Sequence, residues 1–191
     1  MKINIKPNSY DFLEYQKKYI NDYEIGIIMG LDPYNSKEEL IKNKIFKNSL
    51  SFNKEKELEK KIKLHANLFF SILKKRNYEP AVFVKENIIA SLDGFHSETK
   101  TMLEIKCPQN KNIHIWKKIC SKNIIPPYYL AQIYCRLYCS DSSKAYFLVY
   151  FHEEDFHLTE INFNNIFIQK MIIEINDYQK ILKKYRKIFK T

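Results

Sequence analysis

Apolar residues recur at helical spacing in several stretches of the chain. They stand three or four residues apart, with Lys and Glu between them, which is the pattern of a helix with one buried face. Ser9, Ser36 and the Pro126-Pro127 pair stand where a helix would begin, and Gly30 stands where one would end. We predict helices over 9–20, 22–30, the segment after Ser36, 54–76, 127–140 and 165–190.

Other stretches carry the pattern of strands. Tyr146 to Phe151 is a continuous apolar run, typical of a buried strand, and 156–163 alternates in polarity and could pair with it. Further strands are predicted over 81–84, 87–92 and 102–106. The order of elements favours an α/β fold, a central mixed sheet flanked by helices. We expect one domain over 1–191, with N-terminal helices over 8–76, a core over 79–163 and a closing helix over 165–190.

Composition narrows the classes of protein. Hydrophobic residues make up 45% of the chain, which argues against disorder, and only 3 glycines occur, too few for a Gly-rich phosphate loop. The formal net charge of +10 favours a polyanionic partner, although AT-rich coding produces the same Lys-rich composition. No apolar run reaches the length of a signal peptide or a membrane span. We therefore expect a cytoplasmic protein without a membrane partner.

Two carboxylates and one amine are predicted to converge at the ends of two strands. Asp93-Gly94 ends one strand pattern, and Glu104, Ile105 and Lys106 lie on the next. Side chains two apart on a strand share a face, so Glu104 and Lys106 point the same way. Two carboxylates can bind a hard divalent ion, the Ile105 carbonyl could add a ligand, and a lysine can act on an attacking water. The alternative interpretation is a surface ion pair across a hairpin.

Four segments together resemble a known family. They read DYEIGIIMGLDPYNSKEELIKNK, SLDG, LEIKCP and YYLAQIYCRLYCSDSSKAYFLVY, in that order, from about Tyr23 to about Tyr150. This arrangement resembles the YqaJ-type viral recombinase and phage lambda exonuclease family, within the PD-(D/E)XK nuclease superfamily. The resemblance implies a restriction-endonuclease-like core. It also implies a Mg²⁺-dependent deoxyribonuclease that digests double-stranded DNA from the 5′ end in phage or plasmid recombination.

The resemblance also implies roles for particular residues. Asp93 and Glu104 would be metal ligands, Lys106 the catalytic lysine and Gln132 a residue facing the site from the following helix. Glu24 stands where the family has an acidic residue on its first helix. Mg²⁺ is the expected ion, with Mn²⁺ as a possible substitute. A single-strand annealing protein is an expected partner, and a homo-oligomer is expected from the ring-shaped trimer of the lambda enzyme.

The chain departs from the family pattern at two places. A glutamate on the helix before the strands is missing from 67–71, and Glu79 follows that helix, so it is not an obvious substitute. Tyr23 stands where the lambda enzyme has a serine that contacts the 5′-phosphate. One metal ion could therefore suffice. A degenerate module on the same fold, binding DNA without cutting it, is the alternative function, and a basic RNA-binding domain is a third.

Further residues are candidates for DNA contact or for structural metal. Lys111, Lys117 and Lys118 are expected in a loop after the Lys106 strand, where they would border DNA or simply be solvated. Tyr128 would pack or stack on a base. The cysteines lack the grouped spacing of a zinc site and are expected to be buried thiols; they are Cys107, Cys120, Cys135 and Cys139.

Overall fold

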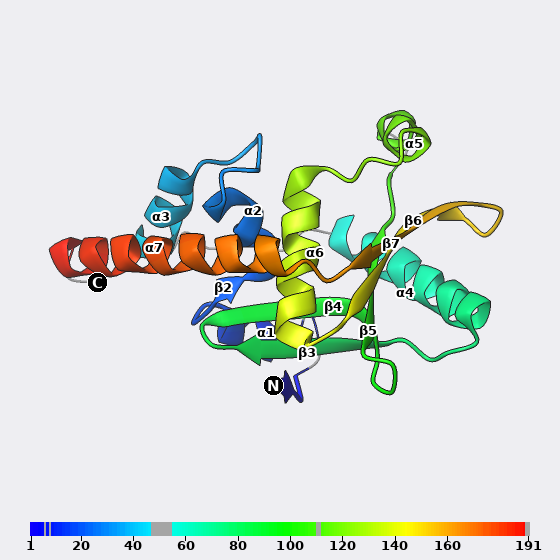
Figure 1. Cartoon of the computed structure of the whole chain (residues 1–191), viewed down its shortest axis with the longest axis horizontal. Helices are drawn as coiled ribbons and strands as arrows, with labels where there is room; N and C mark the ends of the chain where they lie inside the picture. Colours follow the sequence, from blue (N-terminus) through cyan, green and yellow to red (C-terminus); the bar gives the residue numbers. More distant parts are fainter. Residues whose placement is uncertain (6, 8, 47–54, 110–111, 190–191) are drawn as a thin grey trace.

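The computed structural model describes residues 1–5, 7, 9–46, 55–109 and 112–189 (Figure 1). The elements follow one another as β1 (Lys2–Ile3), α1 (Tyr10–Gln16), β2 (Ile20–Asn21), the 3-10 helix η1 (Asp22–Glu24), α2 (Ile25–Ile28), α3 (Lys37–Phe46), α4 (Glu55–Lys74), β3 (Glu79–Lys85), β4 (Ile88–His96), β5 (Thr101–Lys106), α5 (Ile113–Ser121), α6 (Pro127–Ser140), β6 (Lys144–His152), β7 (Asp155–Asn162) and α7 (Asn165–Phe189).

The strands form one mixed sheet in the order β1-β3-β4-β5-β6-β7. β5 and β6 run parallel, which requires a long crossover, and α5 and α6 provide it. β4 pairs with β5 only over Gly94–His96, and the short strand β2 pairs with β4 in parallel at Ile88 and Ile89. β4 therefore pairs with β2 at its start and with β5 at its end. Residues 90–93 of β4, between these two pairings, pair with neither strand.

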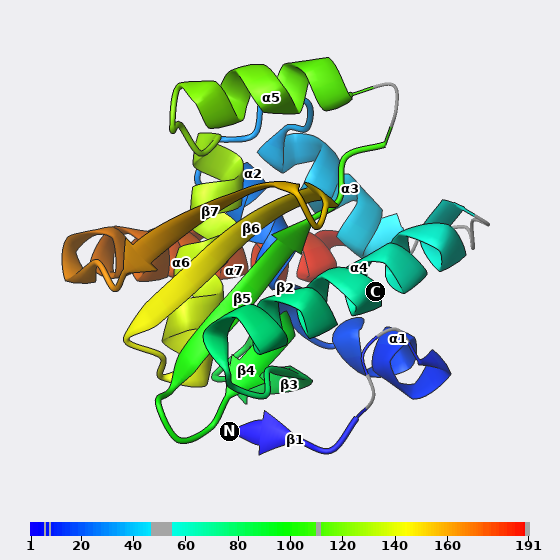
Figure 2. The ribbon, with the colours of Figure 1, turned by 90° about the vertical axis from the view of Figure 1, so that its right-hand side faces the viewer.

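Helices cover both faces of the sheet, as the sequence predicted. α6 lies on one face and α4 on the other, with β5, β6 and β7 between them (Figures 1 and 2). Alternation along β5 divides the core, because Met102 packs with the α6 side while Leu103 and Ile105 pack with Ala66 and Phe70 of α4. The predicted central mixed sheet flanked by helices is confirmed.

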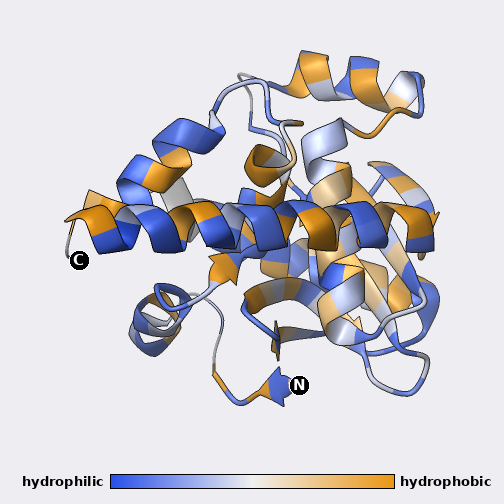
Figure 3. Ribbon diagram, turned by 60° about the vertical axis from the view of Figure 1, so that its left-hand side comes forward, coloured by the Kyte–Doolittle hydropathy of each residue, from blue (hydrophilic) through white to orange (hydrophobic). Residues whose placement is uncertain are grey.

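α7 closes the α6 side of the molecule. Its buried residues recur every three or four positions; they are Ile168, Met171, Ile175, Tyr178 and Leu182. Polar and apolar residues alternate along the helix in Figure 3. Within the described ranges, no helix is both long and apolar enough to span a membrane.

One predicted loop and one predicted helix boundary were wrong. Residues 113–121 form helix α5 instead of a loop, because Trp116, Ile119 and Cys120 are half-buried at helical spacing between exposed lysines. The helix predicted over 9–20 ends at Gln16, because Ile20 and Asn21 leave it to pair with β4. Most other predicted elements occur with ends moved by a few residues, and α6 spans 127–140 as predicted.

Candidate functional site

Asp93, Glu104 and Lys106 come together where β4 and β5 separate. The register pairs Gly94 with Leu103, so Asp93 and Glu104 are the next residues on either strand. Lys106 Nζ lies 2.8 Å from Glu104 Oε1 on the same face of β5. Between them, the Ile105 side chain is fully buried against α4, and its backbone N–H donates to Asp93 Oδ2 at 2.8 Å. The two carboxylates and the amine therefore form one cluster.

α4 contributes two further side chains to this cluster. Lys63 Nζ lies 3.2 Å from Asp93 Oδ1, and Asn67 Nδ2 donates to the Asp93 backbone carbonyl at 2.7 Å. A Cβ atom at Gly94 would lie 2.9 Å from Asn67 Nδ2 and 2.9 Å from Tyr78 Cβ. Gly94 therefore lets the helix approach the strand closely enough for both contacts with Asp93.

α6 and η1 add a buried acid–base pair. Arg136 Nε lies 2.6 Å from Asp22 Oδ2, while its Nη1 contacts Glu104 Oε2 and lies 4.0 Å from Asp93 Oδ2. Asp22 Oδ2 also accepts the Ser91 N–H at 3.0 Å, and Oδ1 accepts from Gln132 Nε2 at 3.4 Å. Gln132 thus reaches the cluster from α6, and its contact there is Asp22.

The cluster holds three carboxylates and three basic side chains, and burial and charge together shift the pKa values of Asp93 and Lys106. Burial raises the pKa of Asp93, but Lys63, Arg136 and the Ile105 N–H outweigh it, so this pKa lies below its ordinary value. Burial and the nearby Lys63 ammonium lower the pKa of Lys106 to about 8, and the carboxylates of Asp93 and Asp22 oppose that shift. A substantial share of Lys106 is therefore neutral in mildly alkaline solution.

A family model described as the YqaJ-like viral recombinase domain matches residues 11–143. The chain belongs to this family. No curated protein sequence matches the chain. The match of the family model includes every residue of the cluster, from Asp22 to Arg136.

Solved exonuclease structures share the fold of this YqaJ-like chain. An alkaline exonuclease from Laribacter hongkongensis has 15% identity and a TM-score of 0.81, with 95% of this chain and 96% of that chain covered. The same enzyme in complex with dAMP has 17% identity, a TM-score of 0.77 and the same coverage. A phage-related exonuclease from Haemophilus somnus 129PT has 13% identity and a TM-score of 0.70, with 93% and 99% covered. At these identities the likeness concerns the fold.

Proteins of such an exonuclease family use a divalent metal ion, and the residues here fit one. A single atom, Arg136 Nη1, reaches both Asp93 Oδ2 and Glu104 Oε2, so one cation can serve both carboxylates. Both Glu104 oxygens are buried and accept no well-oriented hydrogen bond from the described residues. No group of three or more His, Cys, Asp or Glu side chains suited to a metal occurs in the described part of the chain. The donors Asp93, Glu104 and the Ile105 carbonyl suit one ion completed by water and phosphate oxygens.

Two predicted supporting acids lie away from this cluster. Glu24 is buried and bound by the Asn21 backbone N–H at 3.1 Å and by Lys44 at 2.7 Å. Glu79 is exposed at the start of β3, where Asn77 Nδ2 donates to it at 3.0 Å. The partners of Glu24 and Glu79 are therefore residues outside the cluster that contains Asp93 and Glu104.

Aromatic side chains line the approach to Lys106. Its ammonium lies 4.2 Å from the centroid of the Tyr129 ring, which packs against Tyr128 with 4.3 Å between centroids. Tyr128 meets the exposed Tyr34 edge-on at 6.1 Å, and a Cβ atom on Gly26 would lie 2.9 Å from Tyr128 Cβ. Tyr128 is therefore held between α2 and the aromatic group. Tyr23, next to Asp22, is 46% exposed.

The predicted basic residues after β5 lie on α5 or outside the described residues. Lys117 pairs with Asp155 of the β6–β7 hairpin at 2.8 Å, and Lys118 is exposed. Lys111 lies outside the described residues. The four cysteines are free thiols; Cys135 and Cys139 are buried, whereas Cys107 and Cys120 are half-buried.

Sequence reasoning missed Lys63, Asn67, Asp22 and Arg136. Lys63 and Asn67 stand four apart on α4, and Arg136 stands four after Gln132 on α6, so each pair shares a helix face. That spacing could have marked the residues as neighbours on one face. Nothing local in the sequence pairs Asp22 with Arg136, which follows it 114 positions later.

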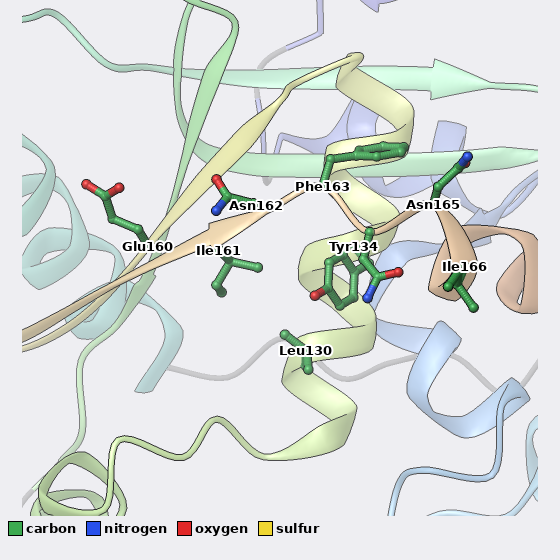
Figure 4. Close-up of a pocket in the computed structure, with 9 residues that line it drawn as sticks. Leu130, Tyr134, Glu160, Ile161, Asn162, Phe163, Asn165 and Ile166 are labelled. Carbon is green, nitrogen blue, oxygen red and sulfur yellow. The ribbon is translucent and has the colours of Figure 1, made fainter.

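A groove of about 620 Å³ lies elsewhere, between α6, the end of β7 and the start of α7 (Figure 4). Leu130, Tyr134 and Phe163 line it together with Glu160, which pairs with Lys144 at 3.0 Å. None of the acid–base cluster lines this groove. Its lining brings a single carboxylate, Glu160, and no basic side chain, too little for a metal site or for phosphodiester cleavage, so the site is assigned to the cluster.

Proposed function

We propose that this protein is a metal-dependent deoxyribonuclease that degrades double-stranded DNA from the 5′ end during phage or plasmid recombination. The observation that carries the proposal is the convergence of Asp93, Glu104 and Lys106 in one buried cluster. Membership of the YqaJ-like viral recombinase family supports the same activity. The exonucleases that share its fold agree with it.

Asp93, Glu104 and the Ile105 carbonyl would hold one ion, Mg²⁺ or in its place Mn²⁺. When bound, this ion would acidify an attacking water and stabilise charge that develops on the phosphate. The Ile105 N–H and the Lys63 ammonium fix Asp93 from two sides, so its carboxylate is oriented before any ligand arrives. Oxygen donors of this kind suit a hard divalent cation.

Lys106 would act on the water that attacks the phosphate. Its neutral amine accepts the proton as the new oxygen–phosphorus bond forms and an ester P–O bond breaks. Since the pKa of Lys106 is lowered to about 8, the neutral form is accessible without extreme alkalinity. Gln132 orients Asp22, which in turn orients Arg136 beside the reacting phosphate.

The DNA would approach over the aromatic and basic surface beside Lys106. Tyr128 and Tyr23 could contact bases or the end of a strand, and Lys111, Lys117 and Lys118 could neutralise phosphates. The net charge of +10 fits such a partner. By family resemblance, the further partners would be a single-strand annealing protein and other copies of the chain in a trimer, in the cytoplasm.

A duplex labelled at one 5′ end or one 3′ end tests the activity and its direction. With Mg²⁺, the protein should release label from the 5′-labelled end first. Glu104→Gln should abolish the release, because it removes a charged ligand. Glu98→Gln is the matched control, since Glu98 lies in the hairpin and is 87% exposed in its side chain. An intact duplex after prolonged incubation with Mg²⁺ or Mn²⁺ would contradict the proposal.

A second candidate function is a DNA-binding module that does not cut. The observation in its favour is the balance of charges, because Lys63, Lys106 and Arg136 already neutralise Asp22, Asp93 and Glu104. Binding of the duplex without any metal-dependent loss of label would establish this function.

A further inference from the structure

The Arg136 guanidinium stands where a metal ion would bridge Asp93 and Glu104. We infer that a divalent ion enters this site only by displacing Arg136 from Glu104, and that Arg136 then remains bound to Asp22. The inference rests on the proposed function, because it concerns the ion which that function requires. It assigns to Arg136 the role of a resident cation that competes with the metal.

The first support is the position of one atom. Arg136 Nη1 contacts Glu104 Oε2 and lies 4.0 Å from Asp93 Oδ2, so it lies between the two carboxylates expected to hold the ion. An ion binding both carboxylates would need the same space. Two cations at one position repel each other strongly, so the ion and Nη1 exclude each other from the space between the carboxylates.

The second support is burial. Glu104 is 1% exposed, and the Arg136 side chain is 9% exposed. A buried carboxylate without a cation is costly, so Glu104 requires a positively charged partner. Glu104 Oε1 also lies 2.8 Å from the Lys106 ammonium, so this carboxylate keeps one basic partner when Arg136 leaves.

The third support is the second partner of Arg136. Its Nε lies 2.6 Å from Asp22 Oδ2, and Asp22 is itself fixed by the Ser91 N–H at 3.0 Å. A pivot of the planar guanidinium about its Nε–H···Oδ2 bond can withdraw Nη1 from Glu104 while Nε stays on Asp22. The guanidinium charge therefore stays paired, and the ion replaces one contact of Arg136.

Lys63 does not compete in the same way. Its ammonium lies 3.2 Å from Asp93 Oδ1 and 3.4 Å from Oδ2, and no ion pair joins it to Glu104 among the described residues. Lys63 therefore contacts one of the two carboxylates, whereas Arg136 reaches both. The site then accepts one ion in place of Arg136 and keeps Lys63.

The test is direct Mn²⁺ binding to the full chain without DNA, followed by electron paramagnetic resonance of the free ion. The variant is Asp22→Asn with Arg136→Gln, because Arg136→Gln alone would leave Asp22 unpaired and able to bind the ion itself. The double variant should bind one Mn²⁺ at least about tenfold more tightly than the wild type. Arg76→Gln is the control for the loss of an exposed guanidinium and should bind as the wild type does.

Equal or weaker Mn²⁺ binding by the folded double variant would overturn the inference. Should the double variant fail to fold by circular dichroism, the wild type provides the answer. The ¹⁵N–H signals of the Arg136 Nη groups should shift as Mg²⁺ is added, with the midpoint of ion binding, because Nη1 loses its contact with Glu104. A signal that stays constant while the ion binds overturns the inference as well.

Degradation of duplex DNA separates this inference from the proposed function. Tighter Mn²⁺ binding by the double variant supports the inference even if neither protein cuts DNA. In that case the proposed nuclease activity is wrong and the inference about Arg136 stands. Cleavage by the wild type, together with unchanged Mn²⁺ binding in the double variant, removes the inference and leaves the nuclease.

Discussion

The Lys63 ammonium of α4 lies 3.2 Å from Asp93 Oδ1 of β4. The side chains are 26% and 19% exposed, so the pair is only partly screened by water. A helix that packs on the sheet thus supplies a cation to an acid expected to bind metal. The same helix fixes the Asp93 backbone through Asn67, so α4 is part of the site as well as part of the core.

Lys63→Met should destabilise the fold by about 1–2 kcal/mol at pH 7, because Asp93 loses a cation that lowers its pKa. Because the pKa of Asp93 is lower in the folded than in the unfolded chain, its carboxylate stabilises the fold at pH values above about 4, its pKa in the unfolded chain. This stabilisation is lost as the pH falls through the pKa of Asp93 in the folded protein. The difference in the free energy of unfolding between variant and wild type, measured by urea denaturation, should therefore shrink at low pH. Lys61→Met, at an exposed position of the same helix, is the control and should change little. A difference that grows below pH 4 would contradict the ion pair.

The Lys106 amine should make the rate of DNA degradation depend on pH. Its pKa of about 8 means that the neutral form increases as the pH rises through that value. If the neutral amine accepts the proton from water, the initial rate in saturating Mg²⁺ should rise from pH 6.5 and level off above about 8 to 9. Lys106→Arg keeps a charge that cannot be lost, so it should be slow at every pH. A wild-type rate that falls across this range would exclude Lys106 as the base.

Gly94→Ala should disturb both the fold and the site. The added methyl group would lie 2.9 Å from Asn67 Nδ2 and 2.9 Å from Tyr78 Cβ, which pushes α4 away from Asp93. We expect a loss of about 1–3 kcal/mol in the free energy of unfolding, together with a lower rate of DNA degradation. Gly30→Asn is the control, because nothing lies within 4 Å of its Cβ position and asparagine tolerates the positive φ of 68°. Equal stability of the two variants would show that the close approach at Gly94 is unimportant.

DNA binding should weaken steeply with salt. Contacts between basic side chains and phosphates release counterions, so affinity for a labelled duplex should fall by roughly tenfold or more between 50 and 200 mM salt. Fluorescence anisotropy in Ca²⁺ measures this binding without turnover. Tyr128→Ala should weaken binding and leave the salt dependence as it is, because a stacking contact carries no charge. Affinity that is insensitive to salt would argue against a basic DNA surface.

The sequence predicted the part of the site that local geometry determines. Glu104 and Lys106 share a face because alternation on a strand is fixed, and Asp93 follows once the two strands pair. Asp22 and Arg136 could not be paired in the same way, because only the packing of η1 against α6 brings them together. The helix α5 was missed for a different reason, since its lysines obscured an apolar spacing that the sequence does contain.

Loss of the Lys106 amine tests the central claim most directly. Wild-type protein, Lys106→Ala and Lys180→Ala should be incubated with a linear duplex and Mg²⁺, and the release of nucleotides measured. Lys180 lies on α7, outside the cluster, and pairs with Asp177, so its variant controls for the loss of a positive charge. We predict release by the wild type and Lys180→Ala, and none by a Lys106→Ala protein that circular dichroism shows to be folded. Equal release by wild type and Lys106→Ala would contradict the assignment of this cluster as the active site.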